Sequence, residues 1–461
     1  MNESKTVDPA SIDEAGPPVA ATGTPWLTED QQDVDNLALT LLDHPEMERA
    51  RATGVARLRQ SLQAGVLDAE ATLDESVENL AFGALQAAVN NDPTRPRVVW
   101  SERLPYRWSG QLYPGCRYGG ETSDRVYRGI GVSPAYRYEI RGRRHPSHPS
   151  PCDFSVEAVP EPAMWGSPIQ AVQAPERIDV DADGTWTVIA DATPTDGRRN
   201  HLHLPPATAT LLVRDTMHDW ARQVPNQVSV RVLNAPAAPP RSRDEIAADG
   251  ARIFLRCIEE TLTLFDNLLR PQRINELTPF YRAVRWGVPG GVIALNRFEL
   301  DLDEALVITL DPITAGYLGI LMSNPWMCSV AYDSRTASLN DAQAQRDDEG
   351  TYTFVLSPRD PGVHNWLDTG GLRTGLFLAR WERFETEPVP VPEPVEGAQA
   401  AAWQPDNRIE RAVREIHRVP LADVAEVIPA GQELVDAPRR AELNAQRRLA
   451  YEVRVHGCPL S

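Results

Sequence analysis

Lysine is almost absent from this sequence of 461 residues. Lys5 is the only one, and every other basic residue is an arginine. A Schiff-base nucleophile, a pyridoxal-phosphate anchor, a phosphate-loop lysine and a kinase-type strand lysine each need a positioned ammonium group. Because Lys5 lies in a polar N-terminal stretch without hydrophobic periodicity, the sequence excludes these four kinds of site.

The sequence also lacks paired cysteines, long apolar runs and an excess of positive charge. Its five cysteines are widely spaced and form no C-x-x-C pair, which is typical of a reduced chain. No stretch approaches the roughly 18 apolar residues of a membrane span, and the N-terminus has no signal-peptide pattern. Acidic residues outnumber basic ones by 65 to 46, so a phosphate backbone is an unfavourable partner. We therefore expect a cytoplasmic protein that binds neither membrane nor nucleic acid.

Helical and strand-like patterns occupy separate blocks of the chain. Between Glu29 and Asn91 apolar residues recur at helical spacing, whereas short strand-like runs separated by Gly, Pro and Asp fill most of the remainder. This pattern predicts a mainly β protein with flanking helices, an α+β class. The expected divisions are a disordered arm at 1–30, a helical segment at 31–92, a first β-sandwich domain at 93–235, a linker and helix at 236–272, a second β-sandwich domain at 273–386, and a spacer with a helical tail at 387–461.

One series of motifs occurs twice in the same order. Chance produces single short matches often, but not three matches at a nearly constant offset. The repetition predicts two related β-sandwich domains of jelly-roll type, each preceded by a helix. The matches pair 183–189 with 349–355 at an offset of 166, Asn200-His201-Leu202 with Asn365-Trp366-Leu367 at 165, and Leu211-Leu212-Val213-Arg214 with Phe377-Leu378-Ala379-Arg380 at 166.

The second copy resembles a known bacterial family. An acidic-Gly turn, a strand end at Ser357-Pro358, the Asn365 loop and a strand closing at Arg380 are similar to the family catalogued as domain of unknown function twelve-fourteen (DUF 1214-like). The resemblance extends over about 281–384, and the first copy resembles the region that precedes it in long members. No reaction is attached to the family, so the resemblance implies an architecture and no mechanism.

The loop at 364–368 carries the densest set of candidate catalytic residues. His364 and Asp368 have no counterparts in the first copy, and we predict that they form an imidazole–carboxylate pair for acid–base catalysis. Asn365 and Arg380 would orient this pair. Both recur in the first copy, which favours the alternative that the asparagine holds its loop and the arginine pairs with a carboxylate or a loop carbonyl. A solvated loop pair is the corresponding alternative for His364 and Asp368.

Aromatic and arginine residues at the entrances to strands are candidates for substrate binding. Such side chains mostly fill sandwich cores, but at a loop they can also line an apolar cavity and bind an anionic group. The candidates for this role are Tyr106, Arg107, Tyr281, Arg285 and Trp366.

A His-x-His pair suggests a second kind of site. His201 and His203 would share one face of an extended segment, as in β-type metal sites, and Asp215 and His218 could complete the ligand set. The second copy lacks these histidines, so a polar loop near a strand end explains the pair equally well.

These observations support three hypotheses about function. The first is a cofactor-independent enzyme that performs lyase, isomerase or hydrolase chemistry on an apolar or aromatic small molecule, using His364 and Asp368. The second is a non-catalytic ligand-binding or assembly protein whose repeated loops are structural. The third is an enzyme that uses a divalent metal at His201 and His203. The partner expected in the first case is a small-molecule ligand, and self-association into a homo-oligomer is left open.

Overall fold

The computed structural model describes residues 28–108, 110–146, 149–160, 171–173, 177–281, 291–384 and 409–456. It consists mainly of antiparallel β-sheets with helices packed against them, as the sequence predicts. Among these residues no helix is both long and apolar enough to cross a membrane. Most of the expected arm at 1–30 and of the expected spacer lies outside the described residues.

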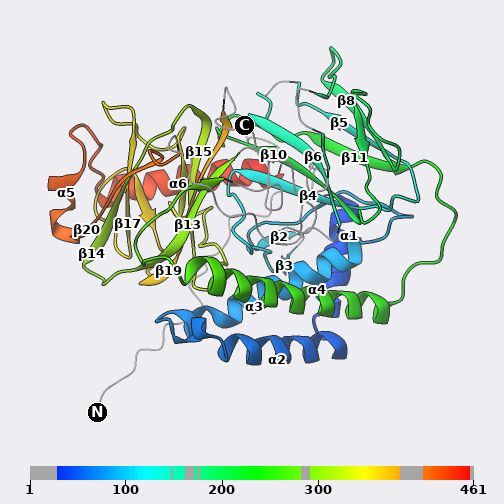
Figure 1. The fold of residues 1–461 in the computed structure, drawn as a ribbon, viewed down its shortest axis with the longest axis horizontal. Coiled ribbons are helices and arrows are strands. Elements are labelled where there is room, and N and C mark those ends of the chain that lie inside the picture. The colour runs from blue at the N-terminus through cyan, green and yellow to red at the C-terminus, as the bar shows by residue number, and fades with distance from the viewer. Residues whose placement is uncertain are drawn as a thin grey trace.

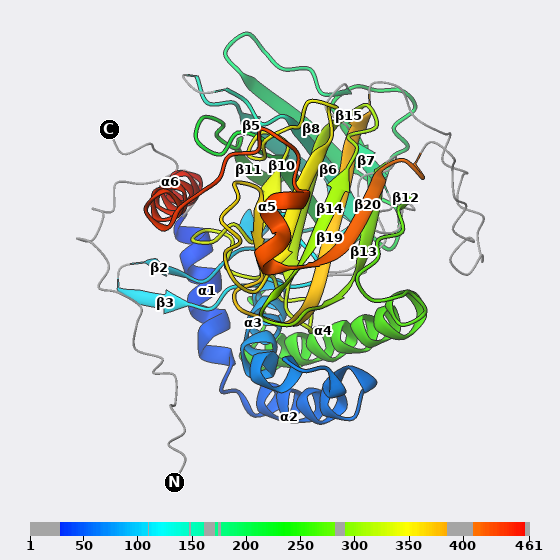
Figure 2. The same ribbon diagram turned by 90° about the vertical axis from the view of Figure 1, so that its left-hand side faces the viewer.

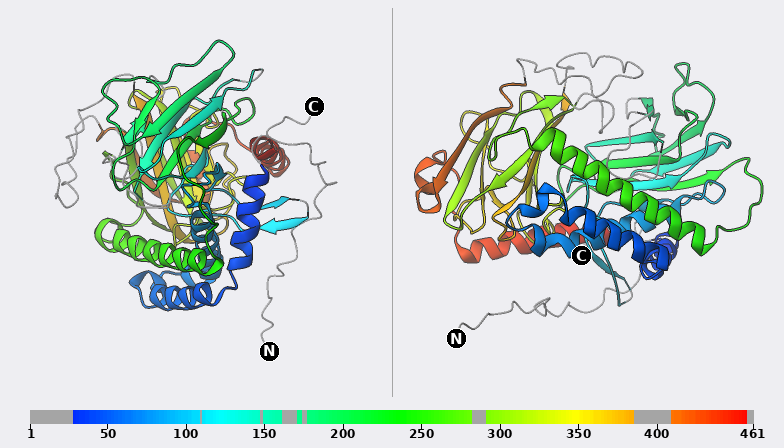
Figure 3. Two further views of the ribbon diagram at one scale, coloured as in Figure 1. Left: turned by 90° about the vertical axis from the view of Figure 1, so that its right-hand side faces the viewer. Right: turned by 60° about the horizontal axis from the view of Figure 1, so that its bottom comes forward.

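A layer of helices lies beneath both halves of the molecule (Figure 1). The block predicted to be helical contains α1 (Glu29–Leu41), α2 (Pro45–Arg59), the short 3-10 helix η1 (Leu62–Gly65) and α3 (Ala69–Asn90). The second predicted helix is α4 (Arg243–Leu264), which begins with a capping box formed by Ser242 and Glu245 and continues into a π-helical turn, η3 (Phe265–Leu269). Figure 3 shows α4 running beneath both sandwiches.

Glycines allow the helices of this layer to approach closely. A Cβ atom at Gly54 would lie 2.5 Å from Ile258 Cδ1, and one at Gly250 would lie 2.6 Å from Leu85 Cδ2. The contacts α2·α4 and α3·α4 therefore leave no room for a side chain at either position. Through this close packing α3 and one face of α4 form a single hydrophobic core with the sheet above them.

The first β-sandwich consists of a five-stranded and a four-stranded sheet. Their facing sides enclose a core that includes Ile140, Val156, Trp186 and Val213. The larger sheet has the order β1 (Val99–Trp100), β4 (Arg125–Gly131), β10 (Thr210–Thr216), β6 (Asp153–Val159), β7 (Ala171–Gln173); the smaller has β11 (Gln227–Val232), β5 (Tyr138–Arg143), β8 (Thr185–Asp191), β9 (His201–His203). A separate hairpin, β2 (Tyr106–Trp108) and β3 (Gln111–Tyr113), follows β1.

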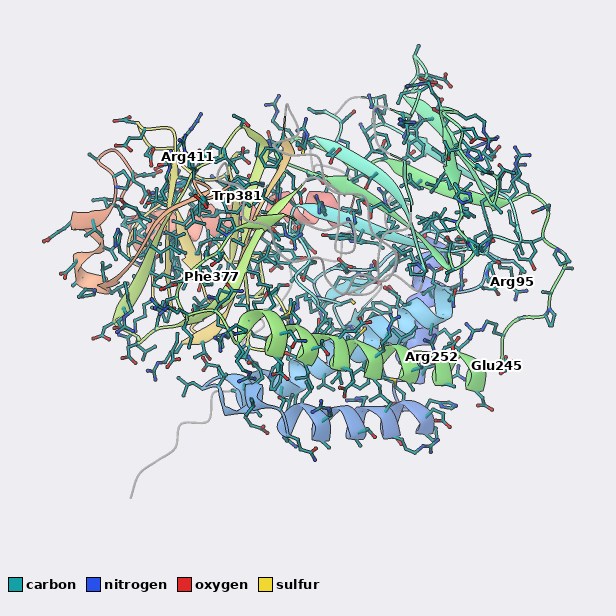
Figure 4. The ribbon with its side chains drawn as sticks, viewed as in Figure 1. Arg95, Glu245, Arg252, Phe377, Trp381 and Arg411 are labelled. Carbon is teal, nitrogen blue, oxygen red and sulfur yellow. The ribbon has the colours of Figure 1, made fainter. Side chains whose placement is uncertain are left out.

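The second β-sandwich has the same composition of sheets. Phe377 and Trp381 lie within it (Figure 4), and both belong to its core together with Leu306 and Phe354. Figure 2 shows its strands above α3 and α4. The five-stranded sheet has the order β12 (Phe280–Tyr281), β13 (Val292–Glu299), β19 (Thr374–Phe384), β15 (Ala315–Ser323), β16 (Ser338–Asn340); the four-stranded sheet has β20 (Val413–Pro420), β14 (Glu304–Leu310), β17 (Tyr352–Ser357), β18 (Trp366–Asp368).

Corresponding strands occupy corresponding places in the two sandwiches. In each, the motif repeated at an offset of about 166 forms the same elements: β8, β9 and β10 in the first and β17, β18 and β19 in the second. The pairs β8·β9 and β17·β18 are both parallel, whereas the other neighbouring strands within the four sheets are antiparallel where a register is described. The series of motifs that occurs twice in the sequence therefore forms the same arrangement of strands in both sandwiches.

The predicted helical tail is wrong over its first part, because β20 is the edge strand of the second sandwich. Its apolar residues Val413, Ile416 and Val419 are three positions apart, a spacing that resembles a helix, and the strand is mostly exposed. The rest of the tail is helical, with η5 (Leu421–Asp423), α5 (Val424–Val427) and α6 (Ala437–His456). In α6, Tyr451 packs against Trp220 and Tyr332, with ring centroids 6.1 and 5.8 Å away.

Candidate functional site

His364 and Asp368 have different partners in the structure. The Nδ1 atom of His364 lies 3.1 Å from Glu433 Oε2, and its Nε2 atom lies 3.2 Å from the backbone oxygen of Gln343. Asp368 is buried at the end of β18 and accepts a hydrogen bond from Arg335 Nη1 at 3.0 Å. Within the described ranges no hydrogen bond or ion pair joins His364 to Asp368. The two residues therefore do not form the expected imidazole–carboxylate pair.

Asn365 holds its loop, as its recurrence in the first copy indicates. The side chain is fully buried. It donates to the backbone oxygens of Gln345 and Thr353 at 2.8 and 3.1 Å, and it accepts from the backbone N–H of Gln345 at 2.7 Å. Both N–H donors and the oxygen of the side-chain amide are thus engaged within the protein, which leaves it unsuited to orient a catalytic pair.

The histidines of the predicted metal site face a loop of the first sandwich. His201 Nε2 lies 3.2 Å from Asp191 Oδ1, and His203 Nδ1 lies 3.1 Å from the backbone oxygen of Thr193. The two imidazoles therefore do approach the same loop, as expected for residues two apart in a strand.

The other two predicted metal ligands are engaged elsewhere. Asp215 is buried and pairs with Arg128 and with Asn226, whose Nδ2 lies 2.6 Å away. His218 Nε2 lies 2.7 Å from Asp341 Oδ1 of the second sandwich. In the part of the chain that the structure describes, no three His, Cys, Asp or Glu side chains gather as a metal site. The predicted four-residue metal site is therefore wrong, because the ligands lie at separate places in the fold.

Tyr106, predicted to bind substrate, belongs instead to a buried cluster around Asp35. Its hydroxyl donates to Asp35, which also pairs with Arg103 and accepts from Gln86 Nε2 at 2.6 Å. The Arg103 guanidinium lies 4.0 Å from the centroid of the Tyr106 ring. These contacts connect α1, α3 and the segment before β2, so the cluster stabilises the packing of the helices against the hairpin.

The remaining predicted substrate residues are not gathered in one place. Arg107 is exposed on β2. Trp366 is buried, donates to the backbone oxygen of Ser357 at 3.2 Å and lies beneath Arg440. For Tyr281 the structure describes the backbone in β12 only, and Arg285 lies outside the described residues.

The segment at 115–124, the central segment of the fold, is buried although it has no regular secondary structure. Loops normally run over the surface because their backbone polar groups need partners, so a buried loop needs a specific set of contacts. Asp124 provides one set, since it accepts from Trp220 Nε1 at 2.6 Å, from the Tyr317 hydroxyl at 2.6 Å and from Asn340 Nδ2 at 3.0 Å. The segment therefore connects the first sandwich to β15 and β16 of the second.

Charged side chains surround this segment, and together with it they form the centre of the molecule. They come from the outer faces of the two five-stranded sheets: on β10 and β19 the residues that alternate with the core positions, including Arg214 and Arg380, point away from the sandwich interiors. Ion pairs neutralise many of the buried arginines here. The pairs are Arg117–Glu75, Arg125–Glu382 and Arg214–Glu157, the last with a distance of 3.1 Å.

Glu102 differs from the carboxylates in these pairs. It lies between β1 and β2 and retains some exposed surface. Its carboxyl group forms no hydrogen bond or ion pair with any residue in the described ranges. Burial raises the pKa of Glu102 to about 8; the charge of Glu121 acts in the same direction, and the charges of Arg214, Arg380 and Arg125 oppose it. A carboxyl group with this pKa is protonated at neutral pH and can release its proton near pH 8.

Glu121 is the second unusual carboxyl group. It is buried in the central segment, where one oxygen accepts from the Ser329 hydroxyl and the other has no partner among the described residues. Burial raises its pKa, which the Ser329 hydrogen bond partly offsets. Glu102 and Glu121 are therefore both biased toward the neutral form at the same place in the fold.

Arg380 is a buried arginine whose hydrogen bonds go to neutral groups. Only 4% of its surface is exposed. Its Nη1 atom donates to Thr122 Oγ1 at 2.5 Å, its Nη2 atom donates to the backbone oxygen of Gly120, and its Nε atom has no partner in the described part of the chain. Both contacts are to neutral oxygens of the central segment, as the alternative of a loop carbonyl predicts.

The buried cysteines do not act as nucleophiles in this arrangement. Burial raises the pKa of the Cys116 thiol well above its usual value, and it raises those of Cys257 and Cys328 to about 12. Only the thiolate is a strong nucleophile, and these thiols remain protonated at neutral pH. The group suited to proton transfer here is therefore the Glu102 carboxyl, on whose pKa the charge of Arg380 acts.

Sequence reasoning missed Glu102 and Glu121. Neither belongs to a motif, and the repeated segments begin downstream of both. One signal was present: Gly119 and Gly120, which adopt φ angles of 83° and 70°, directly precede Glu121. Adjacent glycines with positive φ indicate a special backbone path, but they do not reveal that this path is buried.

Comparisons with known proteins give a fold and no activity. No protein-family model matches the chain, and no curated protein matches it. Among solved structures, an uncharacterized protein from Burkholderia cenocepacia is similar with a TM-score of 0.64 and 22% sequence identity, over 84% of this chain and all of that one. The VPA0106 protein from Vibrio parahaemolyticus matches with a TM-score of only 0.39 and 11% identity, over 68% of this chain and 95% of its own. The first likeness supports the fold described above.

Proposed function

We propose that this protein is a cofactor-independent enzyme that performs acid–base chemistry on a small molecule, with Glu102 as the proton donor and acceptor. The observation that carries the proposal is the state of Glu102: a partly exposed residue whose carboxyl group has no hydrogen-bond or ion-pair partner among the described residues and whose pKa is raised to about 8. General acid–base catalysis is most efficient when the catalytic pKa lies near the working pH. Strongly shifted groups of this kind concentrate at functional sites.

Arg380 would supply the electrostatic part of this chemistry. A buried guanidinium stabilises negative charge that develops on a substrate oxygen when a proton is moved. The proposal thus keeps the reaction class expected from the sequence and retains Arg380, while the acid–base role moves from His364 and Asp368 to Glu102. His364 and Asp368 act in holding the C-terminal segment and the loop after β18 in position.

The test compares wild type with Glu102→Gln, which keeps the shape of the protonated acid and cannot transfer its proton. Each protein is incubated with a bacterial small-molecule extract, and the mixture is followed by mass spectrometry. We expect wild type to consume a compound, and the variant to do so slower by about two orders of magnitude or more. Glu349→Gln, which alters an exposed glutamate in the turn before β17, is the matched control and should behave as wild type.

Two outcomes would contradict the proposal. If Glu102→Gln consumes the compound at the wild-type rate, Glu102 is not the acid–base residue. If wild type changes no compound relative to heat-denatured protein, the hypothesis of a non-catalytic ligand-binding or assembly protein replaces that of an enzyme.

The two sandwiches are further inferred to derive from one duplicated jelly-roll-like domain. The common strand order and the parallel final pair in each support this inference. Membership of the second sandwich in the DUF 1214-like family remains part of the proposal, and it rests on the Asn365 loop and the strand ending at Arg380. A cytoplasmic location is proposed as well, and the four cysteines in the described ranges, which are all unpaired, favour it.

A further inference from the structure

The two repeated arginines have different partners. Arg214 on β10 and Arg380 on β19 occupy equivalent strand positions and both face away from the sandwich cores. Arg214 forms an ion pair with Glu157 of the neighbouring strand β6. Glu157 lies opposite Leu212 in that ladder, and the residue opposite Leu378 in the second sandwich is Leu321.

The second copy therefore has a leucine where the first has the counter-ion. Arg380 occupies the same strand position and is buried, yet it has no carboxylate partner among the described residues. The other buried arginines of the centre do have one, and the ion pairs of Arg103, Arg117, Arg125 and Arg128 join them to Asp35, Glu75, Glu382 and Asp215 respectively. A buried charge without a counter-ion is costly, and an anion from outside the chain would remove that cost.

In the described part of the chain, neither Glu102 nor Glu121 forms an ion pair with Arg380, whose two hydrogen bonds go to Thr122 and Gly120. The charges of Glu102 and Glu121 interact with Arg380, but burial raises the pKa of both carboxyl groups toward the neutral form. Among the described residues, Thr122 and Gly120 each accept from one of the five N–H donors of Arg380, and its Nε–H has no partner.

We propose that Arg380 binds the carboxylate of a small monocarboxylic acid, which enters the centre beside Glu102. This inference rests on the proposed function for its location and names the substrate class. A carboxylate matches the planar guanidinium and carries a single charge, equal and opposite to that of Arg380. A phosphate or sulfate dianion would leave a net negative charge in a buried place.

The surroundings of Arg380 indicate what the rest of the acid is made of. A Cβ atom at Gly120 would lie 3.2 Å from Leu378 Cδ1, 3.4 Å from Met327 Cε and 3.9 Å from Arg380 Nη2, so two apolar side chains pack against Gly120 close to the guanidinium. An acid with an aromatic or aliphatic body fits these surroundings better than a polar one.

The experiment measures binding of sodium benzoate by calorimetry, with acetate, inorganic phosphate and the uncharged analogue benzamide as comparison probes. We expect benzoate to bind wild type with a Kd of about 1 mM or lower, acetate more weakly, and benzamide and phosphate not measurably. Failure of benzoate to bind overturns the inference, and so does equal binding of benzamide. Binding of phosphate in preference to benzoate assigns a different anion to the site and also overturns it.

The matched variants use the difference between the two copies. Leu321→Glu places in the second sandwich the counter-ion that Arg214 has in the first, and we expect it to weaken benzoate binding about tenfold or more. Leu321→Gln has a similar shape without the charge and should bind within about threefold of wild type. If Leu321→Glu folds and binds benzoate as wild type does, the inference is wrong. If it does not fold, the same comparison is made with Arg380→Gln.

The pH dependence separates this inference from the proposed function. Above pH 8 the ionised Glu102 should repel the ligand, so benzoate affinity should fall between about pH 7 and pH 9 in wild type and stay level in Glu102→Gln. The other charged groups that face Glu102 are Glu121, Arg125, Arg214 and Arg380, and they are the same in both proteins. Benzoate binding without turnover of any compound contradicts the proposed function alone. Turnover of uncharged compounds without benzoate binding contradicts this inference alone.

Discussion

Asn200 and Asn365 hold corresponding loops of the two sandwiches with the same three hydrogen bonds. Each side-chain amide donates to two backbone oxygens and accepts from one backbone N–H, and one residue supplies both an oxygen and the N–H. For Asn200 the partners are Asp179 and Thr187, at distances of 3.1, 2.8 and 2.6 Å; for Asn365 they are Gln345 and Thr353, at 2.8, 3.1 and 2.7 Å. Asn365 is fully buried, whereas Asn200 is partly exposed.

This difference in burial predicts different costs for the same substitution. Asn365→Ala leaves buried backbone groups without partners and should lower the free energy of unfolding by about 2–3 kcal/mol. Asn200→Ala should cost about 1–2 kcal/mol, partly because Asn200 adopts a φ of 53°, which alanine tolerates less well. Urea denaturation of both variants measures the two values. Equal costs, or a larger cost at Asn200, would contradict the assignment of burial as the deciding factor.

The ion pair between Arg125 and Glu382 connects β4 of the first sandwich to β19 of the second. Both side chains are almost fully buried. Arg125→Met should therefore lower the free energy of unfolding by about 3–5 kcal/mol, because it leaves the Glu382 charge buried. Replacing both residues, as in Arg125→Met with Glu382→Leu, should restore part of the loss.

The measurement for this pair is a double-mutant cycle by chemical denaturation. Arg57 and Glu259 form an exposed ion pair between α2 and α4, and the same kind of cycle there should give a far smaller coupling. A coupling at Arg125–Glu382 no larger than that at Arg57–Glu259 would mean that the two sandwiches do not depend on the buried pair.

The sequence alone predicts the elements that have a strong local pattern. The helices, the two sandwiches and the structural role of Asn365 follow from hydrophobic spacing and from internal repetition. β20 could not be recognised, because Val413, Ile416 and Val419 have a helix-like spacing and only pairing with β14 makes the segment a strand.

The candidate site is less predictable, because its chemistry depends on partners that are distant in sequence. His364 forms a hydrogen bond with Glu433, which is 69 residues away, and Asp368 forms one with Arg335, which is 33 residues away. Two residues that are close in sequence therefore bind different partners and not each other. The pKa of Glu102 depends on burial, on the charge of Glu121 in the segment at 115–124 and on the charges of arginines from three strands. The missing counter-ion of Arg380 becomes visible only when the register of β15 against β19 is known.

His364 fixes the segment that precedes α6. Its side chain pairs with the carboxylate of Glu433, and its backbone N–H donates to the backbone oxygen of Glu433 at 2.9 Å. The backbone N–H of Val435 donates to the backbone oxygen of Gly362 at 2.7 Å. His364→Ala removes the side-chain contact, which should cost about 1 kcal/mol and raise local opening about fivefold. Hydrogen exchange followed by mass spectrometry should register faster uptake around 431–436 and no change in β10. Unchanged uptake around 431–436 would show that the backbone bonds suffice without the imidazole.

The raised pKa of Glu102 makes the stability of the protein depend on pH with a definite sign. In the unfolded chain a glutamate releases its proton near pH 4.5, whereas in the folded protein Glu102 keeps it until about pH 8. Between these values the folded state binds the additional proton, so stability falls as the pH rises, by up to about 1.4 kcal/mol per pH unit from this group. Above pH 8 both states are ionised and the contribution is constant.

Glu102→Gln removes this dependence, because glutamine stays neutral at every pH. The difference in unfolding free energy between Glu102→Gln and wild type should therefore increase in favour of the variant from pH 5 to pH 8 and then level off, as measured by urea denaturation at each pH. Asp153, whose burial raises its pKa to about 6, acts in the same direction but is present in both proteins and cancels in the difference. A difference that stays constant from pH 5 to pH 9 would mean that Glu102 titrates normally in the folded protein, and the acid–base role assigned to it would lose its physical basis.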